Sequence, residues 1–235
     1  MNIKFISMDK EVIEKFPVLP AKKLLPKWFK DLPSEKFVYP LGGTLPTIKK
    51  CMPATDMLTG GYIIQNVTDI DIIKEEVQGN FVENRIKVKN NQYAPEAHRF
   101  EMCPVKNPDK QHWIKLKNPW VVRTPPGYSC LFTSPFNTER RDTRIITAVV
   151  DTDKYETYIN FPFFLKDWDH YVSRKKVVKK GTPIALVFPF RRDDWEMKIN
   201  NDPNLNKKIS IWSWNYFSTL YDLYRSKVWT RKNYK

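Results

Sequence analysis

Two carboxylates that follow an apolar run are the residues of this chain best placed to do chemistry. Asp151 and Asp153 come directly after the run IITAVV, in the sequence VVDTDKYE. Side chains at positions i and i+2 of a strand point to the same side, so the two carboxylates can act together. Such a pair can activate a water molecule, hold Mg²⁺ or accept a sugar hydroxyl. The sequence Asp-Thr-Asp-Lys also suits a hairpin turn in which an aspartate caps its own backbone, and both interpretations stay open.

Histidines and nucleophiles show none of the spacings that mark a known site. His98, His112 and His170 form no HxH, HxD or HExxH pattern, which favours surface or interface roles over metal binding. Ser134 lies in FTSPFN, where Ser-Pro indicates a turn, and no GxSxG occurs. Gly42-Gly43 lacks the phosphate-loop spacing, and the glycines of a dinucleotide-binding fold are absent. These enzyme classes are therefore set aside.

Short β-branched and aromatic runs surround the acidic pair and predict an antiparallel sheet. They extend from Val121 to Phe188 and are separated by Pro125-Pro126-Gly127 and by Gly181. With 18 Pro, 8 Trp and only 7 Gly, the composition is typical of β proteins with long ordered loops. We expect almost no helix in this stretch. Upstream, the sequence predicts strands over 37–90 and a polar loop over 91–117.

The C-terminus carries the best helical pattern of the chain. Trp214, Phe217 and Tyr221 fall at i, i+3 and i+7, so they share one face of a helix, and we expect them at an interface. One helical turn is also predicted to start at Pro26. The predicted organisation is an N-terminal arm over 1–36, a β core over 37–190, a charged linker over 191–208 and a C-terminal amphipathic helix over 209–235.

Charge and cysteine content limit the partners and the compartment. A net charge of +14 favours an anionic partner such as nucleic acid, a nucleotide or an acidic protein surface, although scattered lysines also fit a basic surface without one. Three cysteines without CxxC spacing indicate a reducing compartment. No run reaches the roughly 18 apolar residues that span a bilayer, and MNIKFISMDK has no signal-peptide core. We expect neither membrane contact nor export by a signal peptide.

The segments TPPGYSCLFTSP, TAVVDTDKY and VKKGTPIALVF resemble, in order and spacing, the motifs of the dUTPase and dCTP-deaminase family, whose fold is called the β-clip. The resemblance implies that Asp151 lies near the deoxyribose and the catalytic water, and that Tyr155 stacks against the sugar. It also implies that Gly181 opens the fourth nucleotide-binding motif. Members of this family often form trimers, so a homo-oligomer is expected.

The chain departs from the family where phosphate is bound. Thr133-Ser134-Pro135 stands in place of Arg-Ser-Gly, and Leu186 replaces a phosphate-binding glutamine. Arg140, Arg141 and Arg144 in TERRDTR are the candidates to substitute for the missing arginine. The segments KNPWVVRTPPGYSCLF, VVDTDKY and KKGTPIALVFPF also resemble a family of tailed-phage and bacterial proteins that has no established activity. This second resemblance implies a phage source, with the protein in the host cytoplasm or the virion.

The prediction is a mainly β fold with a β-clip or jelly-roll-like antiparallel core, an N-terminal arm and a C-terminal helix. Because the phosphate-binding arginine is missing, the predicted function is a non-catalytic binding or assembly protein, with a structural role in the virion included, and no cofactor. The alternative is a nucleotide-binding enzyme, such as a deoxynucleoside triphosphate pyrophosphatase, in which Asp151 positions water and Mg²⁺ is the cofactor. A third alternative, a metal-dependent oxygenase on a jelly roll, lacks its ligand motif.

Overall fold

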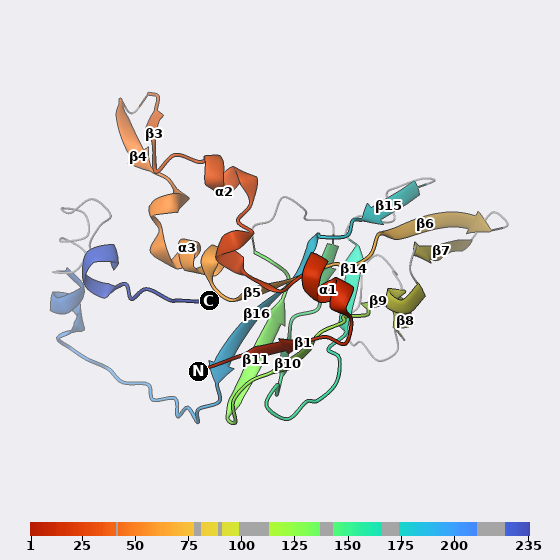
Figure 1. The fold of residues 1–235 in the computed structure, drawn as a ribbon. Coiled ribbons are helices and arrows are strands. Elements are labelled where there is room, and N and C mark those ends of the chain that lie inside the picture. Colours follow the sequence, from red (N-terminus) through yellow and green to blue (C-terminus); the bar gives the residue numbers. More distant parts are fainter. Residues whose placement is uncertain are drawn as a thin grey trace. The chain divides into compact units, whose positions relative to one another are not determined.

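The computed structural model shows a mainly antiparallel β protein (Figure 1). It describes residues 1–40, 42–77, 81–88, 91–98, 113–136, 143–165, 174–210 and 224–235. Every strand pairing among these residues is antiparallel. The described residues between Val121 and Phe188 include no helix, which confirms the sequence prediction. The chain divides into two compact units, a first unit of Met1–Leu24 with Gly61–Arg192 and a second unit of Leu25–Gly60 with Asp193–Lys235.

The first unit contains a five-stranded sheet in which strands far apart in sequence lie side by side. Its strands, in spatial order, are β13 (Ala148–Val150), β11 (Tyr128–Thr133), β16 (Pro183–Arg191), β5 (Tyr62–Gln65) and β2 (Leu19–Pro20). Successive side chains of a strand alternate between faces. Cys130 and Phe132 of β11 therefore point into the core, and Leu131 points to the opposite face.

Three smaller sheets and a few short helices complete the first unit. The sheets are β12 (Thr143–Ile145), β14 (Phe161–Leu165), β9 (Trp113–Leu116) and β8 (Glu96–His98); β15 (Arg174–Val178), β6 (Ile70–Val77) and β7 (Phe81–Val88); and β1 (Lys4–Ile6) with β10 (Val121–Arg123). The helices are α1 (Lys10–Lys15) and the 3₁₀ turns η1 (Ala21–Lys23) and η3 (Asn91–Tyr93). Helix α1 begins where the Asp9 carboxylate accepts the backbone N–H of Glu11 at 2.9 Å.

One hydrophobic core is shared by these sheets. Phe132 of β11, Phe163 of β14, Val122 of β10 and Val187 of β16 each expose 1% or less of their surface. The rings of Phe132 and Phe161 lie 5.9 Å apart between centroids, which joins the five-stranded sheet to β14. Burial of large side chains from several sheets is the main stabilising term that holds them together.

The second unit combines a hairpin with short helices. Its elements are α2 (Lys27–Asp31), β3 (Glu35–Val38), β4 (Gly43–Pro46), η2 (Ile48–Lys50), α3 (Met52–Thr59), a helical segment at 205–210 and the π-helical turn η5 (Tyr224–Val228). The Trp229 indole N–H donates to the two carboxylate oxygens of Asp56 at 3.2 and 3.0 Å, and Lys232 Nζ lies 2.8 Å from the same carboxylate. These bonds hold the C-terminal residues against α3.

The structure corrects two local predictions. Helix α3 lies inside 37–90, which was predicted as strands, because Pro53 suits the first helical turn and Ala54, Met57 and Leu58 favour the helix that follows. Strands β8 and β9 lie inside the predicted polar loop 91–117. Glu96 of β8 forms ion pairs with Lys115 of β9 and with Lys117, so the charged residues of this stretch belong to paired strands and do not indicate a loop.

The described helices of the C-terminal region are short. Residues 205–210 are helical, residues 229–235 have no regular structure, and Trp214, Phe217 and Tyr221 lie outside the described residues. No helix in the described part of the chain combines the length and the apolar character that a membrane crossing requires.

Candidate functional site

Asp151 and Asp153 lie in a turn directly after strand β13. The backbone carbonyl of Asp151 accepts the N–H groups of Lys154 and Tyr155 at 3.0 and 2.9 Å, which closes the turn. Because β13 pairs with β11 so that Val150 lies opposite Cys130, the chain brings Asp151 beside Ser129. Each interpretation of the sequence is therefore correct in part. The segment is a turn, and its two carboxylates also point toward the same group.

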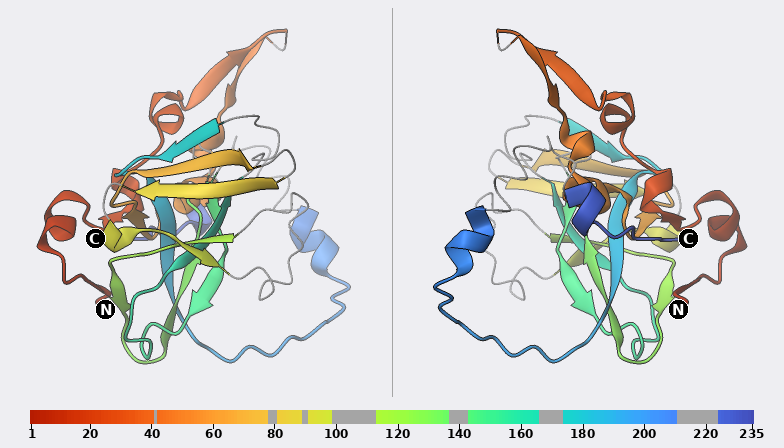
Figure 2. Two further views of the ribbon diagram at one scale, coloured as in Figure 1. Left: turned by 90° about the vertical axis from the view of Figure 1, so that its right-hand side faces the viewer. Right: turned by 90° about the vertical axis from the view of Figure 1, so that its left-hand side faces the viewer.

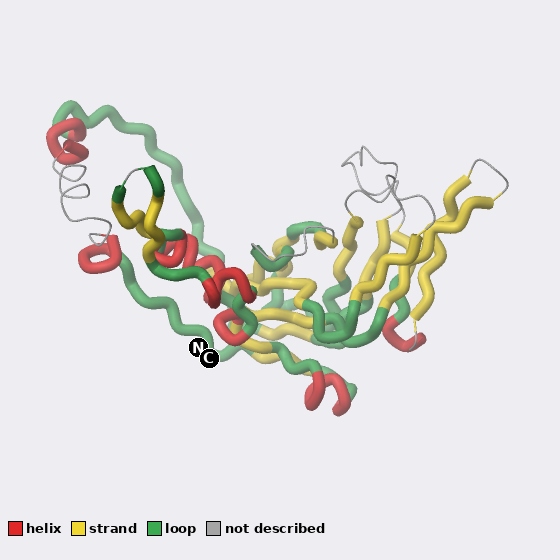
Figure 3. Tube along the Cα trace, turned by 90° about the horizontal axis from the view of Figure 1, so that it is seen from above, coloured by secondary structure: helices red, strands yellow, loops and turns green. Residues whose placement is uncertain are grey.

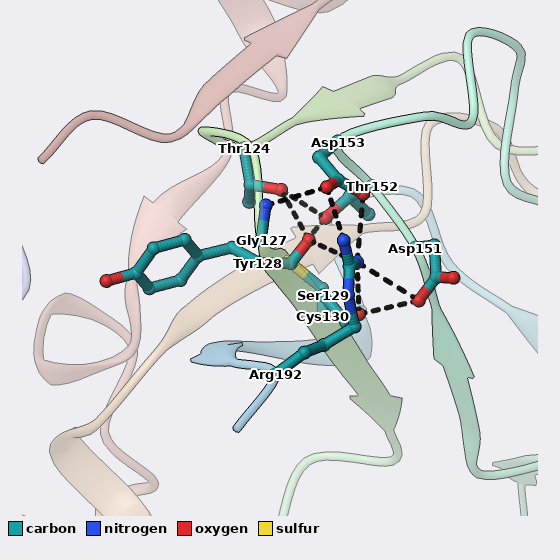
Figure 4. A network of polar contacts seen from close by, with 9 residues as sticks. All are labelled: Thr124, Gly127, Tyr128, Ser129, Cys130, Asp151, Thr152, Asp153 and Arg192. Carbon is teal, nitrogen blue, oxygen red and sulfur yellow. Dashed lines mark hydrogen bonds and ion pairs between the residues drawn. The ribbon is translucent and has the colours of Figure 1, made fainter. Parts of the chain in front are cut away.

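The group on which the two carboxylates converge is the guanidinium of Arg192 (Figure 4). Arg192 Nη1 donates to Asp153 Oδ1 at 2.9 Å, and Nη2 donates to Asp153 Oδ2, so this ion pair is bidentate. Nη1 also lies 3.2 Å from Asp151 Oδ1. The Ser129 hydroxyl donates to Asp151 Oδ1 at 2.7 Å and accepts from Arg192 at 2.9 Å. The one guanidinium thus bonds to both carboxylates and offsets half of their combined charge.

The pairing of three strands positions this arginine. Arg191, the last residue of β16, lies opposite Tyr128 of β11, so Arg192 emerges at the end of the sheet where β11 begins. Its backbone N–H donates to the Gly127 carbonyl at 2.9 Å, and Nη1 reaches the Tyr128 carbonyl at 3.0 Å. The Gly127 N–H in turn donates to Asp153 at 2.8 Å. The turn before β11, the turn after β13 and the end of β16 are therefore bonded to one another.

A second layer of hydroxyl groups lies under the ion pair. The Thr124 and Thr152 hydroxyls are 2.7 Å apart, and Thr152, which is 1% exposed, donates to Cys130 Sγ at 3.3 Å. Burial raises the pKa of the Cys130 thiol to about 11, so this thiol is neutral at pH 7. It acts as a weak acceptor in the core and not as a nucleophile.

The two carboxylates differ sharply in exposure and electrostatics. The Asp153 side chain is 4% exposed, whereas that of Asp151 is 56% exposed. The hydrogen bonds from Arg192 lower the pKa of Asp153 to about 2, with a smaller contribution from the Gly127 N–H. Asp153 is therefore a sequestered structural anion, and Asp151 is the carboxylate that solvent and ligands can reach.

The low pKa of Asp153 predicts a defined loss of stability in acid. An aspartate in the unfolded chain has a pKa of about 3.9, so the ion pair stabilises the fold above that pH and is lost as the pH falls from about 4 to about 2. We expect the melting temperature of the wild type to fall more steeply in this window than that of Asp153→Asn, measured by circular dichroism at half-unit steps. Asp9 and Glu96, whose pKa values are also lowered, titrate in both proteins alike. Parallel curves would contradict the assignment.

The other predicted nucleotide-binding residues are spread over the first unit. Tyr155 is 43% exposed beside the acidic turn, and Arg144 is exposed on β12. Gly181 lies in the turn before β16, with its N–H donating to the Asn66 carbonyl at 2.7 Å. Ser129, and with it Asp151, lies opposite Phe190 near the other end of β16. At about 3.3 Å per residue, Gly181 and Asp151 are on the order of 25 Å apart in one chain.

Several predicted residues lie outside the described part of the chain, namely Arg140, Arg141, His112, His170, Trp214, Phe217 and Tyr221. His98 belongs to β8. Within the described ranges, no group of three or more His, Cys, Asp or Glu side chains gathers as a metal site would require.

Arg192 and Ser129 are the site residues that sequence reasoning missed. Arg192 was counted as part of a charged linker, although Arg191-Arg192 directly follows the apolar run IALVFPF. The separation of 39 residues between Asp153 and Arg192 left no local pattern to join them. The useful signal was an arginine pair at the end of one apolar strand and an aspartate pair at the end of another.

Comparison with known proteins finds a remote likeness to dUTPases. No family model matches the chain, and no curated protein matches it. Among solved structures, the EIAV dUTPase is 10% identical, with 61% of this chain and 84% of that chain covered and a TM-score of 0.33. The dUTPase of Staphylococcus bacteriophage 80alpha with dUpNHpp is 11% identical, with 86% and 89% covered and a TM-score of 0.39. The dUTPase of S. aureus phage phi11 is also 11% identical, with 87% and 99% covered and a TM-score of 0.38. At this level of similarity no residue role, activity or assembly is carried over to this chain.

Proposed function

We propose that this chain is a non-catalytic binding or assembly protein on a mainly antiparallel β fold. The observation that supports the proposal is that Arg192 engages both Asp151 and Asp153. A pair that binds Mg²⁺ through two carboxylates needs both of them free to turn toward the ion. Here Asp153 is almost fully buried in a bidentate ion pair, so the acidic turn acts as a structural clasp.

The proposal extends to partners and source. The net charge of +14 supports an anionic partner, such as nucleic acid, a nucleotide or an acidic protein surface. The sequence resemblances described above support a phage source, a place in the host cytoplasm or the virion, and a homo-oligomer.

A second candidate is a deoxynucleoside triphosphate pyrophosphatase with Asp151 as the base that positions water. One observation favours it: the Asp151 side chain is 56% exposed yet oriented by the Ser129 hydroxyl at 2.7 Å. An exposed carboxylate held in one orientation by a neighbour is what a general base requires. In this candidate, cationic side chains other than Arg192 hold the triphosphate, and Mg²⁺ is bound by groups other than the ion-paired Asp153.

The substitution Asp151→Asn separates the two candidates. We expect the wild type to release no pyrophosphate from any deoxynucleoside triphosphate with Mg²⁺ present. We also expect Asp151→Asn to change the free energy of unfolding by less than about 1 kcal/mol, because the amide oxygen still accepts from Ser129 and the lost ion pair is exposed. Urea unfolding and a pyrophosphate assay measure the two quantities. Pyrophosphate release by the wild type that falls about 10²- to 10⁴-fold in Asp151→Asn would establish the enzyme instead.

A further inference from the structure

The hairpin of the second unit exposes two aromatic rings at its end. Strands β3 and β4 form a two-stranded ribbon, drawn in orange in Figures 1 and 2 and seen from above in Figure 3. Phe37 of β3 is 59% exposed, and Tyr39, directly after β3, is 88% exposed. Two residues apart, their Cα atoms are at most about 7 Å from one another. The two rings therefore form one aromatic patch, a feature that marks an interaction surface more often than a single exposed ring does.

The base of this hairpin is fixed to the helix before it. The Thr47 backbone N–H donates to the Ser34 carbonyl at 3.0 Å, which joins the chain after β4 to the chain before β3. Lys49 Nζ donates to the Leu32 and Lys30 carbonyls at the end of α2, at 2.8 and 3.1 Å. Within the described residues no third strand pairs with β3 or β4, and a two-stranded hairpin alone is marginally stable in water. These bonds therefore hold the ribbon in one orientation to α2, so binding requires little further ordering.

Lysines without an acidic partner surround the base of the ribbon. Lys27 and Lys30 of α2 and Lys36 of β3 are exposed, and none of them pairs with a carboxylate of the described residues. Glu35 is already paired with Lys50. Residues 25–50 contain five lysines, one aspartate and one glutamate, so their net charge is +3. The hairpin and α2 together present unpaired positive charge beside exposed rings.

Exposed rings and unpaired cations are the two features with which proteins hold single-stranded nucleic acid. Aromatic side chains stack on bases, each of which has a flat π-face, and cationic side chains contact the phosphates. In a duplex the bases are stacked on one another, so their faces are not open to protein rings. The net charge of +14 also favours the approach of a polyanion.

A protein partner fits this surface less well. Lysine is depleted from the centres of protein interfaces, because an ammonium group without a counter-charge is costly to desolvate. On the ribbon Lys36 lies opposite Leu45 and next in sequence to Phe37, so a protein that covers the apolar residues must also desolvate this ammonium group. Each nucleotide offers a base and a phosphate together, which matches a ring with a neighbouring lysine.

We propose that the β3–β4 hairpin and α2 form a binding surface for single-stranded nucleic acid, in which Phe37 and Tyr39 stack with bases and the exposed lysines contact phosphates. This inference rests on the binding function proposed above and names its anionic partner. Single-stranded DNA and RNA share this chemistry, and separate oligonucleotides distinguish them.

The first test removes the rings and keeps the apolar character. Fluorescence anisotropy with labelled dT and U oligonucleotides of about 20 nucleotides should show binding of at least one single strand by the wild type at about 50 mM salt. Binding of the matching duplex should be at least about 10-fold weaker. Phe37→Leu with Tyr39→Leu should weaken single-strand binding about 10- to 100-fold. Trp195→Leu, which removes a 90% exposed ring outside the hairpin, is the control and should leave the affinity unchanged.

The second test measures the phosphate contacts through the salt dependence of binding. Each phosphate that a lysine neutralises contributes roughly 0.7 to the slope of log K against log salt for a single strand. Lys30→Gln with Lys36→Gln should therefore make the slope shallower by about 1.4. Lys179→Gln with Lys180→Gln removes the same charge from two exposed lysines of the first unit and should leave the slope as in the wild type.

Three results would overturn the inference. The first is a wild type that binds neither single strand at about 50 mM salt or binds the duplex as tightly. The second is an affinity that survives both hairpin variants, which leaves the binding function standing but places the nucleic acid elsewhere. The third is a ring variant that loses self-association, measured by light scattering, and keeps its affinity for nucleic acid. The substituted side chains are exposed, so unchanged circular dichroism spectra are expected and check folding. Pyrophosphate release would contradict the proposed function without bearing on these affinities.

Discussion

Arg192→Gln should lower the melting temperature of this protein by on the order of 10 °C at pH 7. The substitution removes the bidentate partner of Asp153, whose side chain is 4% exposed, and leaves a buried carboxylate with only the Gly127 N–H and weak contacts. Removal of one member of a buried ion pair is strongly destabilising because the remaining charge is uncompensated. The same substitution also breaks the bonds to Ser129 and to the Tyr128 carbonyl, which join β16 to β11.

Two further variants make this prediction specific. Arg123→Gln removes the same charge from an exposed ion pair with Glu156 at 3.4 Å and should shift the melting temperature by at most about 2 °C. Adding Asp153→Asn to Arg192→Gln should restore part of the lost stability, because it removes the uncompensated charge. Thermal unfolding followed by circular dichroism checks all three proteins. Equal effects of Arg192→Gln and Arg123→Gln would mean that the clasp contributes little.

Local patterns were sufficient to predict the β core. The runs between Val121 and Phe188 either alternate apolar and polar residues or are continuously apolar, and Pro125-Pro126-Gly127 and Gly181 separate them. The positions of the strands therefore follow from residues that are close together in the sequence. Helix α3 was missed because the Gly60-Gly61 pair resembles a hairpin turn, whereas the chain ends the helix there and starts β5. A glycine pair marks a change of direction and does not specify the element before it.

The candidate site could be predicted only in part, because its parts meet through strand register. The sequence indicated that Asp151 and Asp153 act as a pair, since their spacing is local. Their partner, Arg192, reaches them only because β16 lies between β11 and β5 with Arg191 opposite Tyr128. Neither the strand order nor the register can be read from one sequence.

Gly61→Ala should be more damaging than the same change at Gly42, Gly43, Gly127 or Gly181, with a loss of about 2–5 kcal/mol in the free energy of unfolding. Gly61 has φ +76°, a conformation that costs an L-residue about 1–2 kcal/mol. A Cβ at this position would also lie 2.5 Å from the Val187 carbonyl oxygen and 3.2 Å from the Phe188 ring. Both contacts belong to β16, which pairs with β5 immediately after Gly61, so the strands would have to separate.

Gly181→Ala is the matched control, because it shares the conformation and lacks the contact. Gly181 has φ +78°, and a Cβ there would meet nothing within 4 Å. Its substitution should therefore cost only the conformational penalty of about 1–2 kcal/mol. The difference between the two variants in urea unfolding measures the steric part alone, which overpacking puts at about 1–3 kcal/mol. Equal losses would mean that β5 and β16 can separate at no cost. The five-stranded sheet would then be too loose to hold Arg192 against Asp153, since the same strand β16 carries both the steric contact and the arginine.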